Sequence, residues 1–265
     1  MKKYFVIGNP IDHSLSPALH NYWLKENNID AVYEKMELSE SDIEGIISEI
    51  KNEKINGINV TVPFKKSVIP FLNELTSVAK KTKSVNTIYK KMDKIIGDNT
   101  DVGGFESALQ NINYNIKGKK AFILGAGGVA PSIIMALKKM GASKIVVSNR
   151  TKQKAEDLKK IYPELDLVNW GSVPEFDIII NATSLGLKEN DTIKLNYRGI
   201  GPNKFFYDVI YNPSKTRFLL KGKELGNQIE NGKTMFAYQA QLAFKIWHNI
   251  EPKVDEKVLK LLEND

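Results

Sequence analysis

The fold is decided by the stretch Ala-Phe-Ile-Leu-Gly-Ala-Gly-Gly-Val-Ala at residues 121–130. Its first four residues are apolar and predict a buried strand over 121–124, and its glycines then predict a tight turn into a helix over 129–140. Another apolar strand, Lys144–Ser148, follows that helix. Strand, glycine turn, helix and strand make one βαβ unit, in which the helix N-terminus can bind a pyrophosphate. A plain tight turn is the alternative interpretation, and the flanking strands favour a dinucleotide site.

Candidate cofactor contacts lie in the turn and after the second strand. Gly125 and Gly127 would allow the tight turn and close approach of the backbone to a ligand, and Ala130 would let helix and strand pack closely. The second strand is followed by Arg150, at a place where NAD-binding proteins usually carry an acidic residue. An arginine suits the 2′-phosphate of NADP(H), which we therefore favour over NAD(H). A solvated Arg150, with Thr151 capping the next helix, is the alternative.

Outward from this unit, apolar strand-like runs alternate with helical patterns, which predicts an α/β fold with largely parallel sheets. Further strands are expected over residues 4–8, 31–38, 57–62, 177–181 and 205–209, with a hairpin of 87–90 and 94–97 around Met92 and Asp93. Helices are expected over residues 41–51, 152–161, 236–247 and 255–262, and one is expected to open at Ser16-Pro17 with Ser16 as N-cap. We expect two domains with a cleft between them: residues 1–101 completed by 237–265, and a Rossmann-type domain of residues 102–236.

The composition is that of a globular protein with a basic surface. The 38 Lys and Arg residues outnumber the 31 Asp and Glu residues, which gives a formal net charge of +7. The lysines are scattered, mostly as pairs within amphipathic segments, and this is typical of a solvated surface rather than of a nucleic-acid-binding stripe. We expect no nucleic-acid partner. A basic nucleic-acid-binding protein remains the alternative, and steep salt-dependent binding to duplex DNA would support it.

Several kinds of site are excluded or disfavoured by missing residues. Cysteine is absent, which excludes disulfides, Cys-ligated zinc and a thiolate nucleophile. The histidines, His13, His20 and His248, lack metal-site spacing, so no metal is expected. No apolar run approaches the ~20 residues of a membrane span, and Gly8-Asn9-Pro10 interrupts the apolar start before a signal peptide could form. We expect a cytoplasmic protein without a membrane partner.

Polar clusters interrupt the N-terminal domain where strands should end. Ser14-Leu15-Ser16-Pro17 places two hydroxyls at a helix N-terminus, which suits a carboxylate, although simple capping is an equal alternative. Residues 59–65 (Asn-Val-Thr-Val-Pro-Phe-Lys) lie at a strand end, where open α/β sheets bind ligands. Residues 84–87 and 97–101 are similarly rich in hydroxyl, amide and carboxylate groups. Each cluster alone could be a turn, but their recurrence in one domain favours a site for a polar ligand.

Taken together, these stretches resemble the shikimate dehydrogenase family along the whole chain. The matching stretches are residues 14–17 with His20-Asn21, 59–65, 84–87, 99–104, 125–128, 149–151, 181–186, 208–213 and 235–240. No single stretch is decisive, but their shared order is specific. The resemblance implies an NADP-dependent oxidoreductase that reversibly reduces 3-dehydroshikimate to shikimate in the biosynthesis of chorismate and the aromatic amino acids.

The resemblance also implies roles for individual residues. It makes Lys65 and Asp101 the catalytic pair. The implied substrate residues are Ser14, Ser16 and Tyr211 for the carboxylate, and Thr61, Asn86 and Gln239 for the ring hydroxyls. The implied cofactor residues are Gly125, Ala126, Gly127, Gly128, Val129, Ala130, Asn149, Arg150, Thr151, Ala182, Thr183, Ser184, Val209, Gly232 and Met235.

Other interpretations differ in cofactor, substrate or activity. A quinate/shikimate dehydrogenase that accepts NAD is the nearest, and Arg150 argues against its cofactor. A cofactor-binding regulator without catalysis would have little reason to keep Lys65 and Asp101 together with the substrate-binding residues. The sequence leaves open whether Lys65 transfers a proton or mainly stabilises negative charge, and whether the protein is a monomer or a homodimer.

Overall fold

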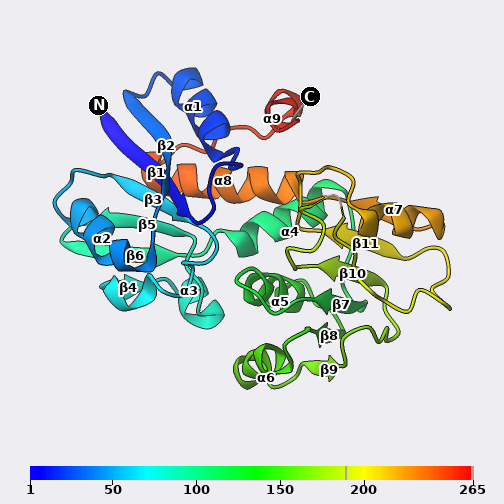
Figure 1. Ribbon diagram of the computed structural model, residues 1–265. Coiled ribbons are helices and arrows are strands. Elements are labelled where there is room, and N and C mark those ends of the chain that lie inside the picture. Colours follow the sequence, from blue (N-terminus) through cyan, green and yellow to red (C-terminus); the bar gives the residue numbers. More distant parts are fainter. Residues whose placement is uncertain (189, 264–265) are drawn as a thin grey trace. The chain divides into compact units, whose positions relative to one another are not determined.

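The chain folds into two compact units in the computed structural model, which describes residues 1–188 and 190–263. One unit comprises Met1–Gly104 with Ala237–Asp265, and the other comprises Phe105–Phe236. Each unit is built on its own six-stranded sheet flanked by helices (Figure 1). The predicted α/β class is confirmed. Among the described residues, no helix is both long and apolar enough to cross a membrane.

The sheet of the first unit is mixed, with the strand order β2-β1-β3-β5-β6-β4. Its strands are β1 (Lys2–Gly8), β2 (Ala31–Glu37), β3 (Gly57–Val60), β4 (Glu74–Leu75), β5 (Thr87–Lys91) and β6 (Lys94–Asp98). Strand β1 pairs in parallel with β2 and β3, whereas β5 runs antiparallel to both β3 and β6. Met92, with a φ of 51°, lies in the left-handed region that a tight hairpin requires, as expected for the turn between β5 and β6.

Helices cover both faces of this sheet. They are α1 (Ser16–Glu26), α2 (Ile43–Lys51), α3 (Ser77–Thr82), α9 (Glu256–Leu261), the short 3₁₀ turns η1 (Glu40–Asp42) and η2 (Ile69–Phe71), and most of α8 (Lys233–His248). Phe5 points into the core beneath α2, while its neighbour Tyr4 points to the opposite face, where its ring centre lies 5.0 Å from that of Trp247 on α8. Gly57 makes room for this helix, because a Cβ there would lie 2.4 Å from Nε1 of Trp247.

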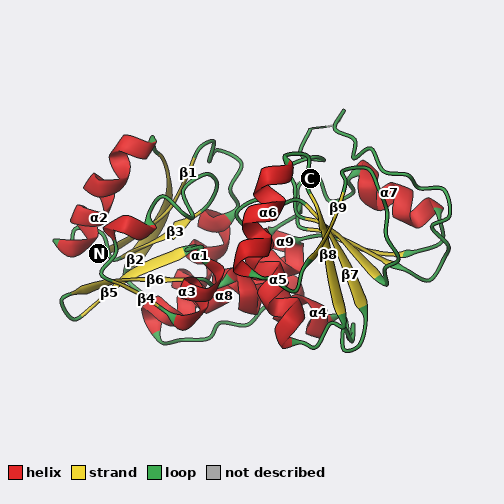
Figure 2. Cartoon of the chain, turned by 90° about the horizontal axis from the view of Figure 1, so that it is seen from below, coloured by secondary structure: helices red, strands yellow, loops and turns green. Residues whose placement is uncertain are grey.

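The sheet of the second unit is parallel throughout, with the order β12-β11-β10-β7-β8-β9. Its strands are β7 (Lys120–Leu124), β8 (Lys144–Ser148), β9 (Asp166–Val168), β10 (Ile178–Asn181), β11 (Phe205–Asp208) and β12 (Gln228–Glu230), and its helices include α5 (Ala130–Lys139), α6 (Lys152–Ile161) and α7 (Arg217–Glu224). Numbered within the unit, this is the 3-2-1-4-5-6 order of a dinucleotide-binding fold. Figure 2 shows α5 and α6 on one side of the sheet and α7 on the other.

Two details of the expected helices are wrong. Helix α1 begins at Ser16 rather than after it, so that Leu15 is the N-cap and no side chain caps the helix. Ser14 supplies the nearby acceptor instead, since its Oγ lies 3.3 Å from the backbone nitrogen of Ser16. Asp101, expected in a loop, is the first residue of α4 (Asp101–Asn111). A carboxylate is favourable there because it faces the positive end of the helix dipole.

Candidate functional site

A buried ion pair forms the centre of the polar clusters in the first unit. The Nζ atom of Lys65 lies 2.6 Å from Oδ2 of Asp101, and the two side chains are only 12% and 7% exposed. Lys65 belongs to the turn that follows β3, and its carbonyl accepts a hydrogen bond from the backbone of Val85 at 2.8 Å. Asp101 opens α4, where its backbone N–H donates to the side chain of Asn99. The pair therefore joins two segments that are held in place by separate backbone contacts.

Asn86 connects this pair to the rest of the cluster. Its Nδ2 lies 2.9 Å from Oδ1 of Asp101, 2.9 Å from the hydroxyl of Thr100 and 3.3 Å from Oε1 of Gln239 on α8. Its Oδ1 accepts the backbone N–H of Thr100 at 2.8 Å and the hydroxyl of Thr87 at 3.1 Å. An amide nitrogen carries only two hydrogens, so three acceptors share them. The longest of the three contacts, to Gln239, is the one that an incoming ligand hydroxyl could replace most easily.

The remaining predicted substrate residues belong to other segments than those of Lys65, Asn86 and Asp101. Ser16 is buried at the start of α1, close to Ser14, and Thr61 is half-buried in the turn that leads to Lys65. The methyl group of Thr61 packs on Gly8, where an added Cβ would approach it to 2.6 Å. Tyr211 belongs to the second unit, where its ring centre lies 4.6 Å from that of Phe236.

Two buried residues that sequence reasoning gave no role complete the cluster. The hydroxyl of Tyr33 donates to Oδ1 of Asn59 at 2.7 Å, and Nδ2 of Asn59 donates to the carbonyl of Asn86 at 3.1 Å. Asn59 was visible within the polar segment after β3, but its partner on β2 had no local signal. The contact joins residues 26 positions apart and depends on the pairing of β1 with both strands.

In the second unit, the predicted cofactor residues gather at one edge of the sheet. The strand register aligns Leu124 with Ser148 and Asn181, and Asn181 with Asp208. The cofactor candidates Gly125, Asn149, Ala182 and Val209 are the residues directly after these strand ends. They therefore surround the carboxyl edge of the sheet, which includes the point between β7 and β10 where the strand order reverses. Ligands of open α/β sheets bind at this kind of position.

Glycines are required where these segments meet. Gly125 has a φ of +109°, and a Cβ there would lie 2.8 Å from the carbonyl oxygen of Ala182 and 2.9 Å from the methyl group of Thr183. Gly232 is closer still, since a Cβ would lie 2.0 Å from the carbonyl oxygen of Val209. These contacts bring predicted cofactor residues together in pairs, and any side chain at the glycines would push the segments apart.

The helix after the glycine turn is suited to an anion. Helix α5 begins at Ala130, has Val129 as its N-cap without a side-chain cap, and carries no acidic residue in its first turn. The N-terminal groups of α5 and the positive end of its dipole favour a phosphate.

Met235, another predicted cofactor residue, is buried near the start of α8.

The segment after β8 offers polar groups and a positive charge. Oδ1 of Asn149 accepts the backbone N–H of Ala126 at 3.0 Å, which ties the segment to the glycine turn. Thr151 is the N-cap residue of α6, but its side chain makes no capping hydrogen bond, so the capping alternative for it is wrong. Arg150 is exposed and forms no ion pair with the described residues. Its guanidinium group is thus placed to meet a phosphate from solvent.

A buried carboxylate to which the sequence analysis gives no role, that of Asp208, holds segments at the carboxyl edge of the second sheet in place. Oδ1 of Asp208 accepts Nδ2 of Asn181 at 3.0 Å, and Oδ2 accepts the hydroxyl of Thr216 at 2.6 Å. Burial raises the pKa of Asp208 to about 6, although these hydrogen bonds oppose the rise. Asn181 also accepts the N–H and hydroxyl of Thr183, so the Asp208 network fixes the segment that carries Ala182 to Ser184.

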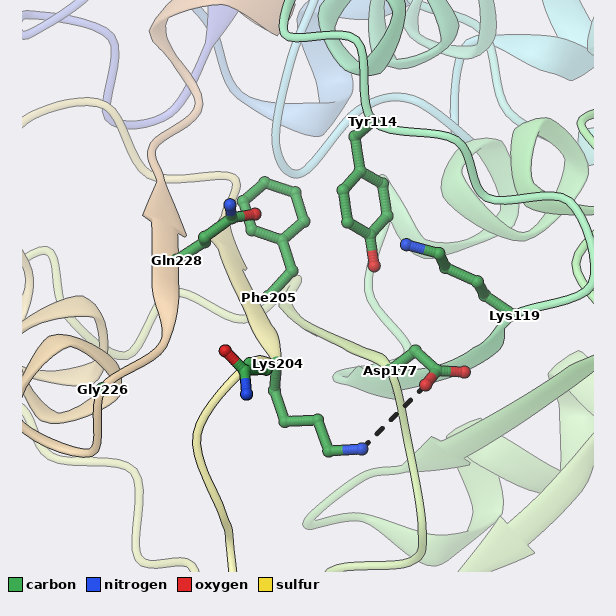
Figure 3. Close-up of a pocket in the computed structure, with 8 residues that line it drawn as sticks. Tyr114, Lys119, Asp177, Lys204, Phe205, Gly226 and Gln228 are labelled. Carbon is green, nitrogen blue, oxygen red and sulfur yellow. Dashed lines mark ion pairs between the residues drawn. The ribbon is translucent and has the colours of Figure 1, made fainter.

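A pocket at the opposite edge of the same sheet is not this site. It is lined by Tyr114, Lys119, Asp177, Asn203, Lys204, Phe205, Gly226 and Gln228, which lie near the amino ends of β7, β10, β11 and β12 (Figure 3). The ammonium of Lys119 lies 3.9 Å from the ring centre of Tyr114, and that of Lys204 lies 3.9 Å from Asp177. Both lysines are thus engaged with other residues that line the pocket, and none of the predicted site residues lines it. Among the described residues, no group of His, Cys, Asp or Glu could hold a metal ion.

Comparison with known proteins gives one consistent result. Residues 6–88 match the model of the shikimate dehydrogenase substrate binding domain, and residues 106–190 match that of shikimate / quinate 5-dehydrogenase. A shikimate dehydrogenase (NADP(+)) from Pelagibacter ubique is 58% identical over 264 residues, which cover 99% of this chain and 100% of that protein.

Solved structures agree over nearly the full length. Shikimate dehydrogenase from Aquifex aeolicus matches with a TM-score of 0.91 and 37% identity, covering 100% of this chain and 98% of that one. Shikimate 5-dehydrogenase from Thermus thermophilus, solved in complex with NADP(H) and shikimate, matches with a TM-score of 0.91 and 30% identity, covering 99% and 98% of the two chains. This chain belongs to the shikimate dehydrogenase family.

Proposed function

We propose that this protein catalyses the reversible, NADPH-dependent reduction of 3-dehydroshikimate to shikimate, a step toward chorismate and the aromatic amino acids. The observation that carries the proposal is the buried pair of Lys65 and Asp101, 2.6 Å apart, in which Asp101 also accepts a hydrogen bond from the amide of Asn86, itself in contact with Gln239. A cationic proton donor surrounded by amide and hydroxyl groups suits a small polyhydroxylated substrate with a carbonyl group. Family membership supports the same reaction.

The substrate is held by groups that match its chemistry. The hydroxyls of Ser14 and Ser16 bind the carboxylate, and the start of α1 adds the positive end of its dipole. Thr61, Asn86 and Gln239 bind the ring hydroxyls. The formal net charge of +7 favours the approach of an anionic substrate and a phosphate-rich cofactor.

The carboxyl edge of the second sheet fits NADP(H). The contacts of Gly125 and Gly232 leave no room for side chains between the converging segments, and the start of α5 is free of acidic residues. Gly125 to Ala130 would hold the pyrophosphate, Asn149 to Thr151 the 2′-phosphate, and residues 182–184, Val209, Gly232 and Met235 the nicotinamide half. When bound, the cofactor supplies the hydride in one direction and accepts it in the other.

Lys65 donates or accepts the proton that accompanies the hydride, depending on the direction of the reaction. In the reductive direction, the Nζ ammonium donates a hydrogen bond to the ketone oxygen, stabilises the negative charge that develops on it, and then transfers a proton to it. In the oxidative direction, neutral Nζ removes the proton from the hydroxyl group. Oδ2 of Asp101 holds Nζ in place, while Oδ1 stays fixed by Asn86.

We also propose that the protein acts in the cytoplasm, as a monomer or homodimer, with small molecules as its partners. Its cofactor and substrate belong to central metabolism, and its chain lacks cysteine.

The test is an absorbance assay at the NADPH band with purified protein, shikimate and NADP⁺, beside parallel wells that contain NAD⁺ or quinate. Formation of NADPH from shikimate and NADP⁺ alone is the expected result. Equal rates with quinate or NAD⁺ would move the assignment to the broader quinate/shikimate relative. No reaction in any well would contradict the proposal.

A further inference from the structure

A continuous chain of buried hydrogen bonds leads from Tyr33 to the proposed catalytic pair within the first unit. The phenol hydroxyl of Tyr33 donates its hydrogen to Oδ1 of Asn59 at 2.7 Å. Tyr33 is 1% exposed and Asn59 is 6% exposed, so water does not compete for these bonds. A phenol has one hydrogen, and here Asn59 receives it.

The chain has a fixed direction beyond Asn59. Because its Oδ1 faces Tyr33, Asn59 presents Nδ2 to the hydroxyl of Thr87 at 3.1 Å. Thr87 can then donate its hydrogen to Oδ1 of Asn86, also at 3.1 Å, which leaves Nδ2 of Asn86 for Oδ1 of Asp101 at 2.9 Å. Each bond settles which end of the next amide donates and which accepts. If the amide of Asn59 turned around, its oxygen would face the carbonyl of Asn86 and repel it.

Tyr33 is itself held rigidly, as a residue at the start of such a chain must be. The side chain of Asn21 accepts the backbone N–H of Tyr33 at 2.9 Å and donates to its carbonyl at 2.8 Å. The ring of His20 stacks on the ring of Tyr33 with centres 4.2 Å apart and planes inclined by 3°. These contacts fix both the backbone and the ring, so the direction of the hydroxyl group follows from the fold.

We propose that Tyr33 is a positioning residue: its hydroxyl sets the orientation of Asn59 and, through Thr87 and Asn86, that of Asp101. Tyr33 acts only through these neighbours. The inference rests on the proposed function, because its effect is measured on shikimate turnover. It predicts that the buried phenol oxygen of Tyr33, which lies outside direct substrate contact, affects kcat/KM for shikimate and leaves the KM for NADP⁺ unchanged.

The test is Tyr33→Phe, which removes only that oxygen. We expect kcat/KM for shikimate to fall by about 5- to 50-fold, the range for a buried acceptor that loses its partner. The KM for NADP⁺ should stay within about twofold, because the predicted cofactor residues belong to the other unit. The matched control is Tyr89→Phe, on β5 of the same sheet, because Tyr89 is half-buried and lies outside the network. It should leave all constants within about twofold.

A double-variant cycle separates positioning from general packing. In Asn59→Ala the hydroxyl of Tyr33 has lost its acceptor, so adding Tyr33→Phe should reduce kcat/KM by no more than about twofold further. Independent structural damage would instead multiply the two effects. If Tyr33→Phe does not fold, Asn59→Ala tests the same hydrogen bond. It should lower kcat/KM for shikimate and leave the KM for NADP⁺ unchanged.

The outcomes distinguish this inference from the proposed function. If the unaltered protein does not oxidise shikimate with NADP⁺, both fall. If the unaltered protein is active but Tyr33→Phe keeps kcat/KM for shikimate within twofold, or if the effects of Tyr33→Phe and Asn59→Ala multiply, the positioning role alone is refuted.

Discussion

Replacing Lys65 by Met removes the charge and the proton of the proposed catalytic centre while keeping an unbranched side chain of similar length. In the structure, Nζ of Lys65 lies 2.6 Å from Oδ2 of Asp101, which is 7% exposed. After the substitution, Asp101 keeps its bond from Asn86 and its place at the start of α4, but loses its only ion-pair partner among the described residues.

The expected loss has two parts. Turnover should fall by about 10²–10⁴-fold, the usual effect of losing a general acid–base group. Stability should fall by about 1–3 kcal/mol, because a nearly buried carboxylate loses its positive partner but keeps a hydrogen bond and a favourable helix dipole. A stability change of this size leaves the protein folded at room temperature, so the fall in turnover reports on chemistry.

The assay is steady-state oxidation of shikimate with NADP⁺, together with thermal unfolding of each variant. Lys66→Met is the matched control, since Lys66 is the adjacent lysine, is exposed, and forms no ion pair with the described residues. The control should keep turnover within about twofold. Turnover of Lys65→Met within about fivefold of the unaltered protein would refute the role assigned to Lys65.

Three further predictions concern the cofactor edge and the two histidines His20 and His248. Arg150→Ala should raise the KM for NADP⁺ by about tenfold, as expected for a lost charge-assisted contact, and leave the KM for NAD⁺ unchanged; equal effects on both cofactors would contradict a 2′-phosphate role. Gly125→Ala should abolish cofactor-induced stabilisation in thermal unfolding, because its Cβ would lie 2.8 Å from the carbonyl oxygen of Ala182 and its φ is +109°; normal binding of NADP⁺ would contradict the required close approach. Burial lowers the pKa of His20 to about 3 and that of His248 to about 4, so the unfolded chain binds protons near pH 6.5 that the folded chain does not bind. The stability is therefore fully present above pH 6.5, and it should fall by about 1.4 kcal/mol per pH unit for each histidine as the pH drops toward 4. A free energy of unfolding, measured with denaturant, that stays constant over this pH range would contradict the prediction.

Local backbone signals in the sequence predict much of the second unit correctly. The glycine turn after β7 depends on the conformation of a few neighbouring residues, and it lies where the sequence places it. The alternation of apolar strands with helices predicts the α/β class for the same reason, since each element has its own periodicity. The roles of the cofactor residues remain predictions.

Contacts between distant residues explain what the sequence could not predict. Asn86 and Gln239 are 153 positions apart, and the bond between Tyr33 and Asn59 requires two strands to pair with β1 in one register. Asp208 and Thr216 are near in sequence, but an aspartate at the end of a strand resembles the first residue of a turn until its burial is known. Resemblance to a family predicts residues of the site, whereas the hydrogen-bond network that joins Tyr33, Asn59 and Asn86 became visible only in three dimensions.

The most direct test of the proposed reaction follows the hydride itself. The protein is incubated with 3-dehydroshikimate and NADPH that carries deuterium at the transferable position of the nicotinamide, and the product is examined by NMR and mass spectrometry. The proposal predicts shikimate with one deuterium on the carbon that had been the ketone. Unchanged 3-dehydroshikimate, or a product without deuterium at that carbon, would contradict it.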